Sequence, residues 1–181
     1  MLFGTEGAEL AVLDFIQSVF KCGFCDRLMT AASALGNNGG LWIAVSAALL
    51  CTKKYRRCGA VMALGLLIGL FVFVLGVKNL VMRPRPFMLN EAAPTIIAKP
   101  TDFSFPSGHT LTAFSSAFIL FARSRRLGTA ALAAAALIAF SRMYLYVHFP
   151  TDILGGIAFA ALIFFALRGL LMKTEKSEQN T

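Results

Sequence analysis

The chain has 181 residues, of which 57% are hydrophobic and 14% charged, with a net charge of +8 at neutral pH. Ordinary soluble domains carry about 25% charged residues, so this composition excludes a typical water-soluble domain. It indicates an integral membrane protein whose apolar surface is covered by lipid.

The first segment combines apolar and acidic residues. MLFGTEGAELAVLDF has no basic region before an apolar run, which argues against a cleaved secretory signal. In residues 8–20, Glu9, Asp14 and Gln17 interrupt the apolar residues, a pattern typical of a helix in the membrane interface. Whether residues 8–40 span the bilayer or lie on it stays open.

Four cysteines raise the question of a redox or metal site. Cys22 and Cys25 form a CGFC motif, but it has no strand–helix context, and Cys51 and Cys58 are predicted at the opposite membrane face. We interpret all four as small apolar residues, and we predict no metal site and no cofactor.

The rest of the chain predicts membrane-spanning helices. A hydrocarbon core about 30 Å thick needs roughly 20 apolar residues per helix. The uncharged run 28–52 is interrupted by GNNGG at 36–40, which indicates either a broken span or a short helix followed by a span from about Gly40. Further uncharged runs cover 58–77, 110–122, 127–141 and 153–167. We therefore predict an all-α, polytopic transmembrane helical bundle of about five to six spans with an N-terminal interfacial helix. It forms a single domain over residues 1–181, with a polar tail at 173–181.

The basic residues segregate to one side of this topology. Lys and Arg gather in KKYRR (53–57), RSRR (123–126) and the C-terminal end, so on a five-span topology this side has ten basic and two acidic residues, and the other has seven of each. An excess of Lys and Arg marks the cytoplasmic side. Membrane orientation thus accounts for the net charge, and we predict no nucleic-acid partner.

Three polar clusters fall at the outer ends of the predicted spans. In KNLVMRPRP (78–86), Lys78 occupies a last helical turn, and Arg85 lies in extended backbone between prolines that end the helix. Lys78 alone would be an ordinary anchor at a helix end. Arg83 is an outer-face basic residue to which we assign no role.

The second cluster is FPSGHT (105–110). Pro106 suits a first helical position, so Ser107, Gly108 and His109 are predicted in the first helical turn. Unpaired backbone N–H groups there, with no side chain at Gly108 to obstruct approach, predict an anion site.

The third cluster is SRMYLYVHFPTD (141–152). Arg142 ends one predicted span, Pro150 starts the next, His148 lies just before it and Asp152 falls in its first turn. A carboxylate at this position is also consistent with simple stabilisation of the helix dipole. The predicted topology, however, brings both histidines of the chain and three cations to one membrane face.

Together these residue types indicate phosphoryl transfer. One imidazole can attack phosphorus while a second protonates the departing oxygen. A carboxylate four residues after His148 can hold one N–H of that ring, so that the other nitrogen attacks. Cationic side chains, two of them planar guanidinium groups, suit phosphate oxygens.

The spacings resemble the three-part signature of the type 2 phosphatidic acid phosphatase superfamily. Its parts here are Lys78 with six residues before Arg85-Pro86, then Pro106-Ser107-Gly108-His109, then Ser141-Arg142 with five residues before His148 and three before Asp152. The match covers 78–152 without departure. The resemblance implies a helical bundle and a metal-independent hydrolase without a cofactor.

The resemblance also implies roles. His148 would be the nucleophile that forms a phosphohistidine, Asp152 its orienting partner, and His109 the acid that protonates the leaving oxygen. The residues expected to hold the phosphate are Lys78, Arg85, Ser107, Gly108 and Arg142.

A lipid phosphate is the expected substrate, because a site at the outer ends of membrane helices suits a headgroup whose tail lies in the bilayer. Undecaprenyl diphosphate is our first candidate, and phosphatidylglycerol phosphate, phosphatidic acid and lipid A phosphates stay open. The protein would be a multi-pass cell-membrane enzyme, in a bacterial plasma membrane, with its site facing the extracytoplasmic side. Loop 87–105 is expected to touch the rest of the headgroup, with no readable preference.

Three alternatives belong to other classes. A transporter or channel also contains buried charges, but these charges cluster at span ends and the interrupted segment has no counterpart. A non-catalytic lipid-binding relative would usually lack a histidine or the aspartate of the signature. A vanadate-dependent oxidase would share the anion pocket, but the lipid-embedded chain argues against it. The oligomeric state is not predicted.

Overall fold

A computed structural model describes residues 4–90, 92–93 and 96–172, and the regular structure in those ranges is entirely helical, which confirms the all-α prediction. The predicted polar tail, 173–181, lies outside the described residues. The elements in chain order are α1 (Glu6–Phe20), α2 (Gly23–Leu35), the 3-10 turn η1 (Asn37–Gly39), α3 (Gly40–Leu50), α4 (Arg56–Ile68), the π-helical η2 (Gly69–Val77), α5 (Lys78–Val81), α6 (Pro86–Leu89), α7 (Gly108–Arg123), α8 (Arg125–Tyr144) and α9 (Pro150–Met172).

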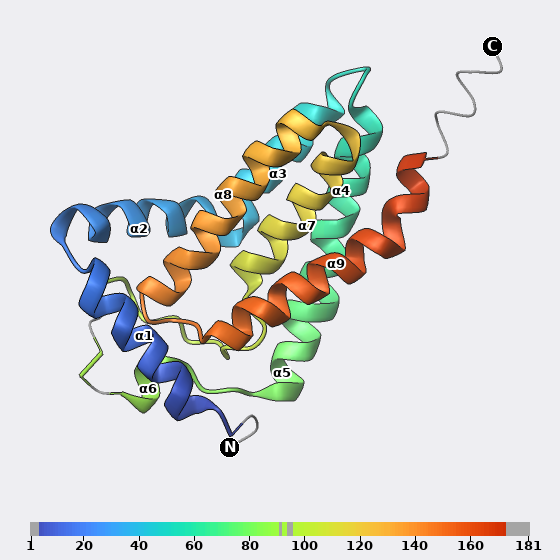
Figure 1. The fold of residues 1–181 in the computed structure, drawn as a ribbon. Coiled ribbons are helices and arrows are strands. Elements are labelled where there is room, and N and C mark those ends of the chain that lie inside the picture. The colour runs from blue at the N-terminus through green and yellow to red at the C-terminus, as the bar shows by residue number, and fades with distance from the viewer. Residues whose placement is uncertain (1–3, 91, 94–95, 173–181) are drawn as a thin grey trace, which may run out of the picture.

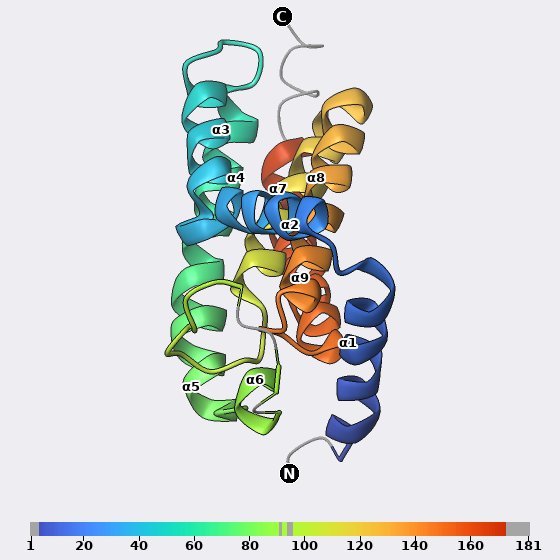
Figure 2. The ribbon, with the colours of Figure 1, turned by 90° about the vertical axis from the view of Figure 1, so that its left-hand side faces the viewer.

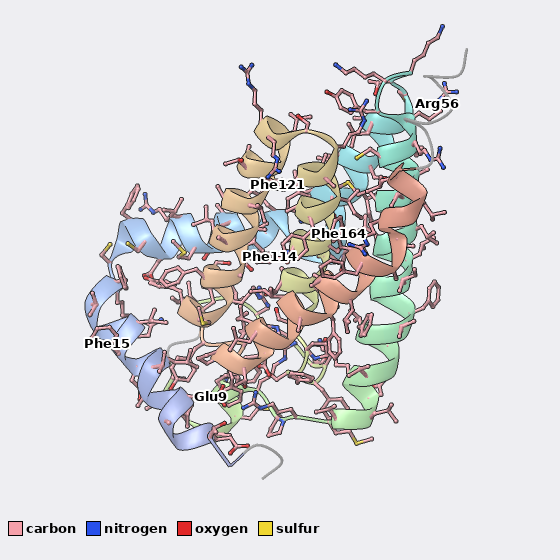
Figure 3. All side chains as sticks on the ribbon, turned by 45° about the vertical axis from the view of Figure 1, so that its right-hand side comes forward. Glu9, Phe15, Arg56, Phe114, Phe121 and Phe164 are labelled. Atoms are coloured by element: carbon pink, nitrogen blue, oxygen red, sulfur yellow. The ribbon has the colours of Figure 1, made fainter. Side chains whose placement is uncertain are left out.

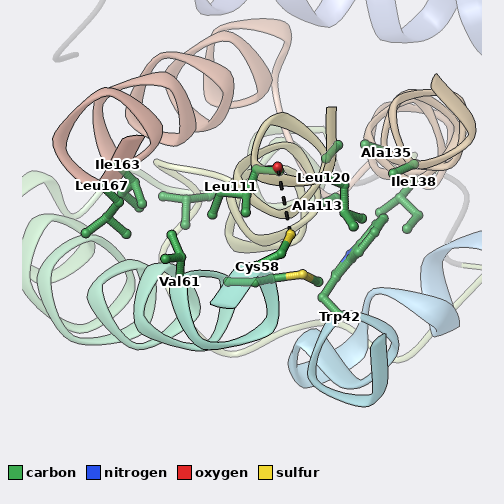
Figure 4. Close-up of a cluster of buried hydrophobic side chains, with 14 residues drawn as sticks. Trp42, Cys58, Val61, Leu111, Ala113, Leu120, Ala135, Ile138, Ile163 and Leu167 are labelled. Carbon is green, nitrogen blue, oxygen red and sulfur yellow. Dashed lines mark hydrogen bonds between the residues drawn. The ribbon is translucent and has the colours of Figure 1, made fainter. Parts of the chain in front are cut away.

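Helix α7 forms the centre of the bundle and packs against α8, α9 and α4. Figure 4 shows the main apolar core around it, with Leu111 and Leu120 of α7 between Trp42 of α3 and Ile163 of α9. Helices α7 and α8 approach very closely at Gly128. A Cβ atom built on this residue would lie only 2.1 Å from the Cα of Phe121. Glycine therefore permits the tight turn between these helices.

The predicted break at GNNGG is confirmed. Asn38 and Gly39 have left-handed backbone angles, with φ of 52° and 67°. Such a conformation is accessible to glycine and asparagine and ends a right-handed helix. As a result, α2 lies across the bundle whereas α3 runs along it, as Figures 1 and 2 show from two directions.

Three helical stretches within the described ranges are long and apolar enough to cross a membrane: Arg56–Leu89, Arg125–Tyr144 and Pro150–Leu171. They contain the predicted runs 58–77, 127–141 and 153–167. The predicted count of five to six spans is not confirmed, because α3 has 11 residues and α7 has 16, both shorter than the roughly 20 that a bilayer core requires. Exposed apolar side chains such as Phe71 and Leu75 cover the outside of the first stretch, as expected for contact with lipid.

Helix α1 buries polar side chains against the bundle and exposes apolar side chains on its outer face. Its inner face buries Glu9 and Gln17 together with Leu13, whereas the side chains of Val12 and Phe15 are exposed. In Figure 3, Phe15 lies on the outer side of α1 and Glu9 on the side of the bundle. The predicted helix over 8–20 is thus present, and its polar residues contact protein.

The ends of the helices sort as the topology predicts. The end of α5, the start of α7, the end of α8 and the start of α9 meet at the lower end of the bundle in Figure 1, together with α1 and α6. The basic connections between α3 and α4 and between α7 and α8 lie at the opposite end, where Figure 3 labels Arg56. All three polar clusters are therefore on one side of the molecule.

Candidate active site

The first cluster follows the end of a long helix. Lys78 begins α5, whose last residue is Val81, and Met82 ends it with a φ of 50°. Arg85 has extended backbone angles, as predicted. The prediction that both prolines end the helix was wrong in detail: the helix ends before Pro84, and Pro86 begins α6, because a first helical position needs no N–H donor.

In the second cluster the helix starts later than predicted. Ser107 is the N-cap residue of α7, and its Oγ accepts hydrogen bonds from the backbone N–H and the hydroxyl of Thr110. Pro106 therefore precedes the cap instead of occupying the first helical position, and Gly108 and His109 form the first turn. A serine hydroxyl that satisfies a free N–H group fixes the start of the helix more strongly than the proline does.

The third cluster has the predicted layout. Arg142 lies in the last turn of α8, Pro150 begins α9, and Asp152 lies in its first turn. The backbone N–H groups of Val147 and His148 both donate to the carbonyl oxygen of Arg142. This tight turn holds His148 between two helix ends.

Two of the predicted phosphate-binding cations share one carboxylate. Arg85 donates to Oδ1 of Asp102 at 2.6 Å, and Lys78 forms an ion pair with Oδ2. Although partial burial raises the pKa of Asp102, the bond from Lys78 and the charge of Arg85 lower it to about 2. Asp102 is therefore ionised at neutral pH. Sequence reasoning missed it, because it lies in the loop 87–105, to which we assigned no chemistry.

His148 is buried and has different partners on its two ring nitrogens. Nδ1 lies 3.4 Å from Oδ2 of Asp152, and Nε2 lies 3.3 Å from a guanidinium nitrogen of Arg85. Burial, followed by the charge of Arg85, lowers the pKa of His148 well below its ordinary value. The ring is therefore neutral at neutral pH, with Nδ1 toward the carboxylate and Nε2 toward the cation.

Asp152 is fully buried and accepts several hydrogen bonds. Its Oδ2 receives the hydroxyl of Ser104 at 2.5 Å and the N–H of Phe149 at 2.8 Å, and its Oδ1 receives Arg83 at 2.7 Å. Ser104 also lies 3.4 Å from Nδ1 of His148. Neither Ser104 nor Arg83 was predicted, because neither belongs to the three-part pattern as we read it.

His109 has a partner from the break between α2 and α3. Its Nε2 lies 3.0 Å from Oδ1 of Asn37, 72 residues away in sequence. Asn37 was predicted to lie in a turn and not in a site. The break in the first helical region therefore does more than redirect the chain, because it brings an amide oxygen to the second histidine.

A cavity of about 1050 Å³ joins most of these residues. Six of the eight predicted site residues line it: Lys78, Arg85, Gly108, His109, Arg142 and His148. Ser107 and Asp152 are fully buried behind this surface. Arg142 donates to the hydroxyl of Ser33 in α2. Away from the charged end, the cavity has apolar walls from α3, α4 and η2, formed by Ile43, Ala47, Leu50, Leu66, Leu67, Leu70 and Val74.

The model of one protein family, the PAP2 superfamily, matches residues 56–175. The chain belongs to the PAP2 superfamily. The resemblance seen in the sequence is thereby confirmed, and a multi-pass membrane location agrees with this membership and with the apolar helices.

Relatives of this PAP2 chain differ in the substrates that their names state. It is 33% identical over 117 residues to an undecaprenyl-diphosphatase of Sulfolobus acidocaldarius, covering 64% of this chain and 56% of that protein. It is 33% identical over 113 residues to phosphatidylglycerophosphatase B of Bacillus subtilis, covering 56% of this chain and 53% of that protein. The chain thus spans about half the length of these curated relatives.

A solved structure shows the same architecture over nearly the whole chain. The transmembrane PAP2-type phosphatidylglycerolphosphate phosphatase of Bacillus subtilis matches with a TM-score of 0.76 and 26% identity, covering 94% of this chain and 88% of that one. The helical arrangement described above is therefore that of a PAP2 membrane phosphatase.

Proposed function

We propose that the protein is a lipid phosphatase that removes the terminal phosphate of a lipid phosphate or diphosphate through a phosphohistidine on His148. The cavity carries this proposal, because its charged end holds both histidines and three cations, and its other walls are apolar. The charged end suits a phosphate headgroup, and the apolar walls suit a hydrocarbon tail. We place the site on the extracytoplasmic side, opposite the basic connections.

In the proposed first step, Nε2 of His148 attacks phosphorus, and the bond from phosphorus to the lipid oxygen breaks. His109, which carries a second ring proton when the anionic headgroup is bound, gives that proton to the lipid oxygen and becomes neutral, and the lipid leaves. Asp152 keeps the proton of His148 on Nδ1 and balances the positive charge that the ring gains. Lys78, Arg85 and Arg142, with the N–H groups at the start of α7, stabilise the negative charge on the other phosphoryl oxygens.

In the second step, His109 accepts a proton from water, whose oxygen attacks the phosphohistidine. The bond between phosphorus and Nε2 breaks, inorganic phosphate is formed, and His148 regains its electron pair. Every proton and electron pair in this cycle is handled by side chains of the chain and by water. The proposal therefore includes independence from metal ions and cofactors.

Undecaprenyl diphosphate is the first candidate substrate. It combines a terminal phosphate with one long hydrocarbon chain, and a relative of this chain is named for that activity. Phosphatidylglycerol phosphate is the second candidate, supported by both a relative and a solved structure named for it. The two differ in the oxygen that leaves, which is a phosphate oxygen in the first and an alcohol oxygen in the second.

The deciding experiment measures phosphate release by the purified full chain in detergent with EDTA. Undecaprenyl diphosphate, phosphatidylglycerol phosphate and phosphatidic acid are supplied in parallel, and the ratios of kcat/KM rank them. We expect turnover of at least one lipid in EDTA. No release from any of them, by protein that elutes as a single folded species, would contradict the proposed function.

A glycine beside His109 provides a second test. A Cβ atom on Gly36 would lie 2.6 Å from Cδ2 of His109, so Gly36→Ala is expected to push the ring from its position. Misplacing a catalytic group by about 1 Å can cost roughly a hundredfold in rate, and we expect a fall in kcat of that order. Gly40→Ala is the matched control, since a Cβ there meets no atom within 4 Å and should leave kcat unchanged. Equal kcat values for the two variants would show that His109 does not depend on this packing.

A further inference from the structure

Arg83, two residues before the signature arginine Arg85, is nearly inaccessible, with an exposed fraction of 2%. Its Nη1 donates to Oδ1 of Asp152 at 2.7 Å and to the hydroxyl of Thr151 at 2.6 Å. The guanidinium group also lies over the ring of Phe149, 4.1 Å from its centre. The start of α9 therefore surrounds a cation that directly contacts the buried carboxylate.

The other end of the guanidinium group contacts α1. Nη2 of Arg83 donates to Oε2 of Glu9 at 2.5 Å. Oε1 of Glu9 accepts both the N–H of Thr151 at 2.9 Å and its hydroxyl at 2.6 Å. Partial burial raises the pKa of Glu9, but the hydrogen bonds from Thr151 and Arg83 outweigh it and lower that pKa. An ionised Glu9 thus ties α1 to both Arg83 and the start of α9.

The backbone of Arg83 contributes as well. Its carbonyl oxygen accepts the N–H of Ser104 at 2.8 Å, and the hydroxyl of Ser104 donates to Oδ2 of Asp152 at 2.5 Å. Oδ1 of Asp152 is therefore held by the side chain of Arg83, and Oδ2 is held by the N–H of Phe149 and by Ser104, which the backbone of Arg83 contacts. A carboxylate held at both oxygens has a fixed direction, and this direction determines where the ring of His148 lies.

We propose that Arg83 is a positioning residue for Asp152 and that Glu9 holds Arg83 in place, so that the N-terminal helix is a working part of the site. This inference rests on the proposed function. Glu9, Arg83 and Asp152 come from three segments separated by 74 and 69 residues, and they meet in a chain of buried ion pairs. Arg83 acts through Asp152 and His148, without touching the phosphoryl group.

The proposal predicts a loss in kcat with little change in KM, because the cations that bind the phosphate stay in place. For Arg83→Met we expect kcat to fall about 10- to 100-fold, the range for removing a partner that orients a functional side chain. KM should stay within about twofold of the wild-type value, since ground-state binding is retained. Arg83→Lys keeps a positive charge but cannot bridge two carboxylates, so its kcat should lie between that of the wild type and that of Arg83→Met.

A double variant separates positioning from folding. Arg83→Met leaves Glu9 and Asp152 buried without their shared cation, which is expected to lower thermal stability. Adding Glu9→Gln removes one of those charges and should restore part of the melting temperature. Turnover per folded molecule should nevertheless stay low, because Asp152 still lacks Arg83. A residue that only stabilises the fold would instead show turnover recovering with the melting temperature.

The experiment uses the full chain in detergent, with turnover expressed per folded molecule from the monodisperse gel-filtration peak. Arg126→Met and Glu6→Gln are matched controls. Arg126 is exposed at the opposite end of the bundle, and Glu6 lies three residues before Glu9 in the first turn of α1. Both variants should retain wild-type kcat. If Arg83→Met yields no folded protein, Arg83→Lys is judged by the same criterion.

Three outcomes would overturn the inference. They are Arg83→Met protein whose kcat per folded molecule stays within about threefold of the wild-type value, a loss of kcat/KM that comes from KM, and a double variant whose kcat recovers together with its stability. Wild-type protein that releases no phosphate from any lipid would count against the proposed function instead. The two failures are therefore distinguishable.

Discussion

Replacing His148 by alanine is expected to abolish phosphate release from every lipid and to remove the covalent intermediate. Its Nε2 is the nucleophile in the proposed reaction, and the other histidine, His109, has a separate task. Losses of about 10⁴- to 10⁶-fold in kcat follow removal of a nucleophile or its base from sites of covalent catalysis, and we expect a loss in that range. The measurement is steady-state phosphate release by folded His148→Ala protein.

The intermediate itself can be measured. Substrate labelled in its terminal phosphate is mixed with enzyme, the reaction is stopped in alkali, and protein-bound label is counted, because phosphohistidine survives alkali and is lost in acid. Wild-type protein should carry label and His148→Ala none. Label that persists in His148→Ala would place the nucleophile on another residue.

Replacing His109 by alanine should have an effect that depends on the leaving oxygen. An alcohol oxygen needs a proton as it departs, and losing a general acid costs about 10²- to 10⁴-fold. We therefore expect His109→Ala to form almost no phosphoenzyme from phosphatidylglycerol phosphate or phosphatidic acid. With p-nitrophenyl phosphate, whose phenolate leaves without a proton, the variant should release about one nitrophenolate per enzyme and then stall, because water is no longer activated.

Undecaprenyl diphosphate should resemble the nitrophenyl ester in this variant, since its leaving group is a phosphate. Rapid-quench measurement of the first turnover with each substrate checks the prediction. Asn37→Ala is an informative comparison, because it removes the partner of His109 and keeps the ring. An equal loss in the first turnover for alcohol and phenol leaving groups would contradict the role of His109 as proton donor.

Much of this arrangement follows from local sequence. The break at GNNGG, the extended backbone at Arg85 and the start of α9 at Pro150 depend on glycine and proline, whose conformational limits act on neighbouring residues. The alternation of apolar runs and polar ends then places three clusters at one end of the bundle. The start of α7 was mispredicted because two local signals competed, and the N-cap serine prevailed over the proline.

The residues that sequence reasoning missed are partners that meet only in three dimensions. Asn37 contacts His109, Asp102 contacts the cations, and Glu9 reaches the site through Arg83. Each lies in a segment whose path depends on packing against other helices, so its spacing from the signature carries no information. Glu9 gave one unused signal: an acidic residue within an apolar helix requires a partner when it is buried.

Packing inside the bundle is also the reason why the sequence alone does not determine the number of membrane spans. Helix α7 lies in the middle of the bundle and buries Ser115 and Ser116 among its neighbours, so its length and hydropathy are set by protein contacts as well as by lipid. Hydropathy measures transfer into hydrocarbon and does not distinguish a central helix of this kind from a lipid-facing one.

If Lys78 and Arg85 hold the phosphate, as proposed, the ion pairs that Asp102 makes with them form a built-in competitor for that ligand. Any phosphoryl group that binds these two cations then competes with a carboxylate that is tethered beside them, and tethering gives this carboxylate a high effective concentration. Free phosphate in the surroundings therefore has to overcome this competitor before it blocks the site. In the proposed reaction, the return of this carboxylate to the cations would help to displace the phosphate that each turnover produces.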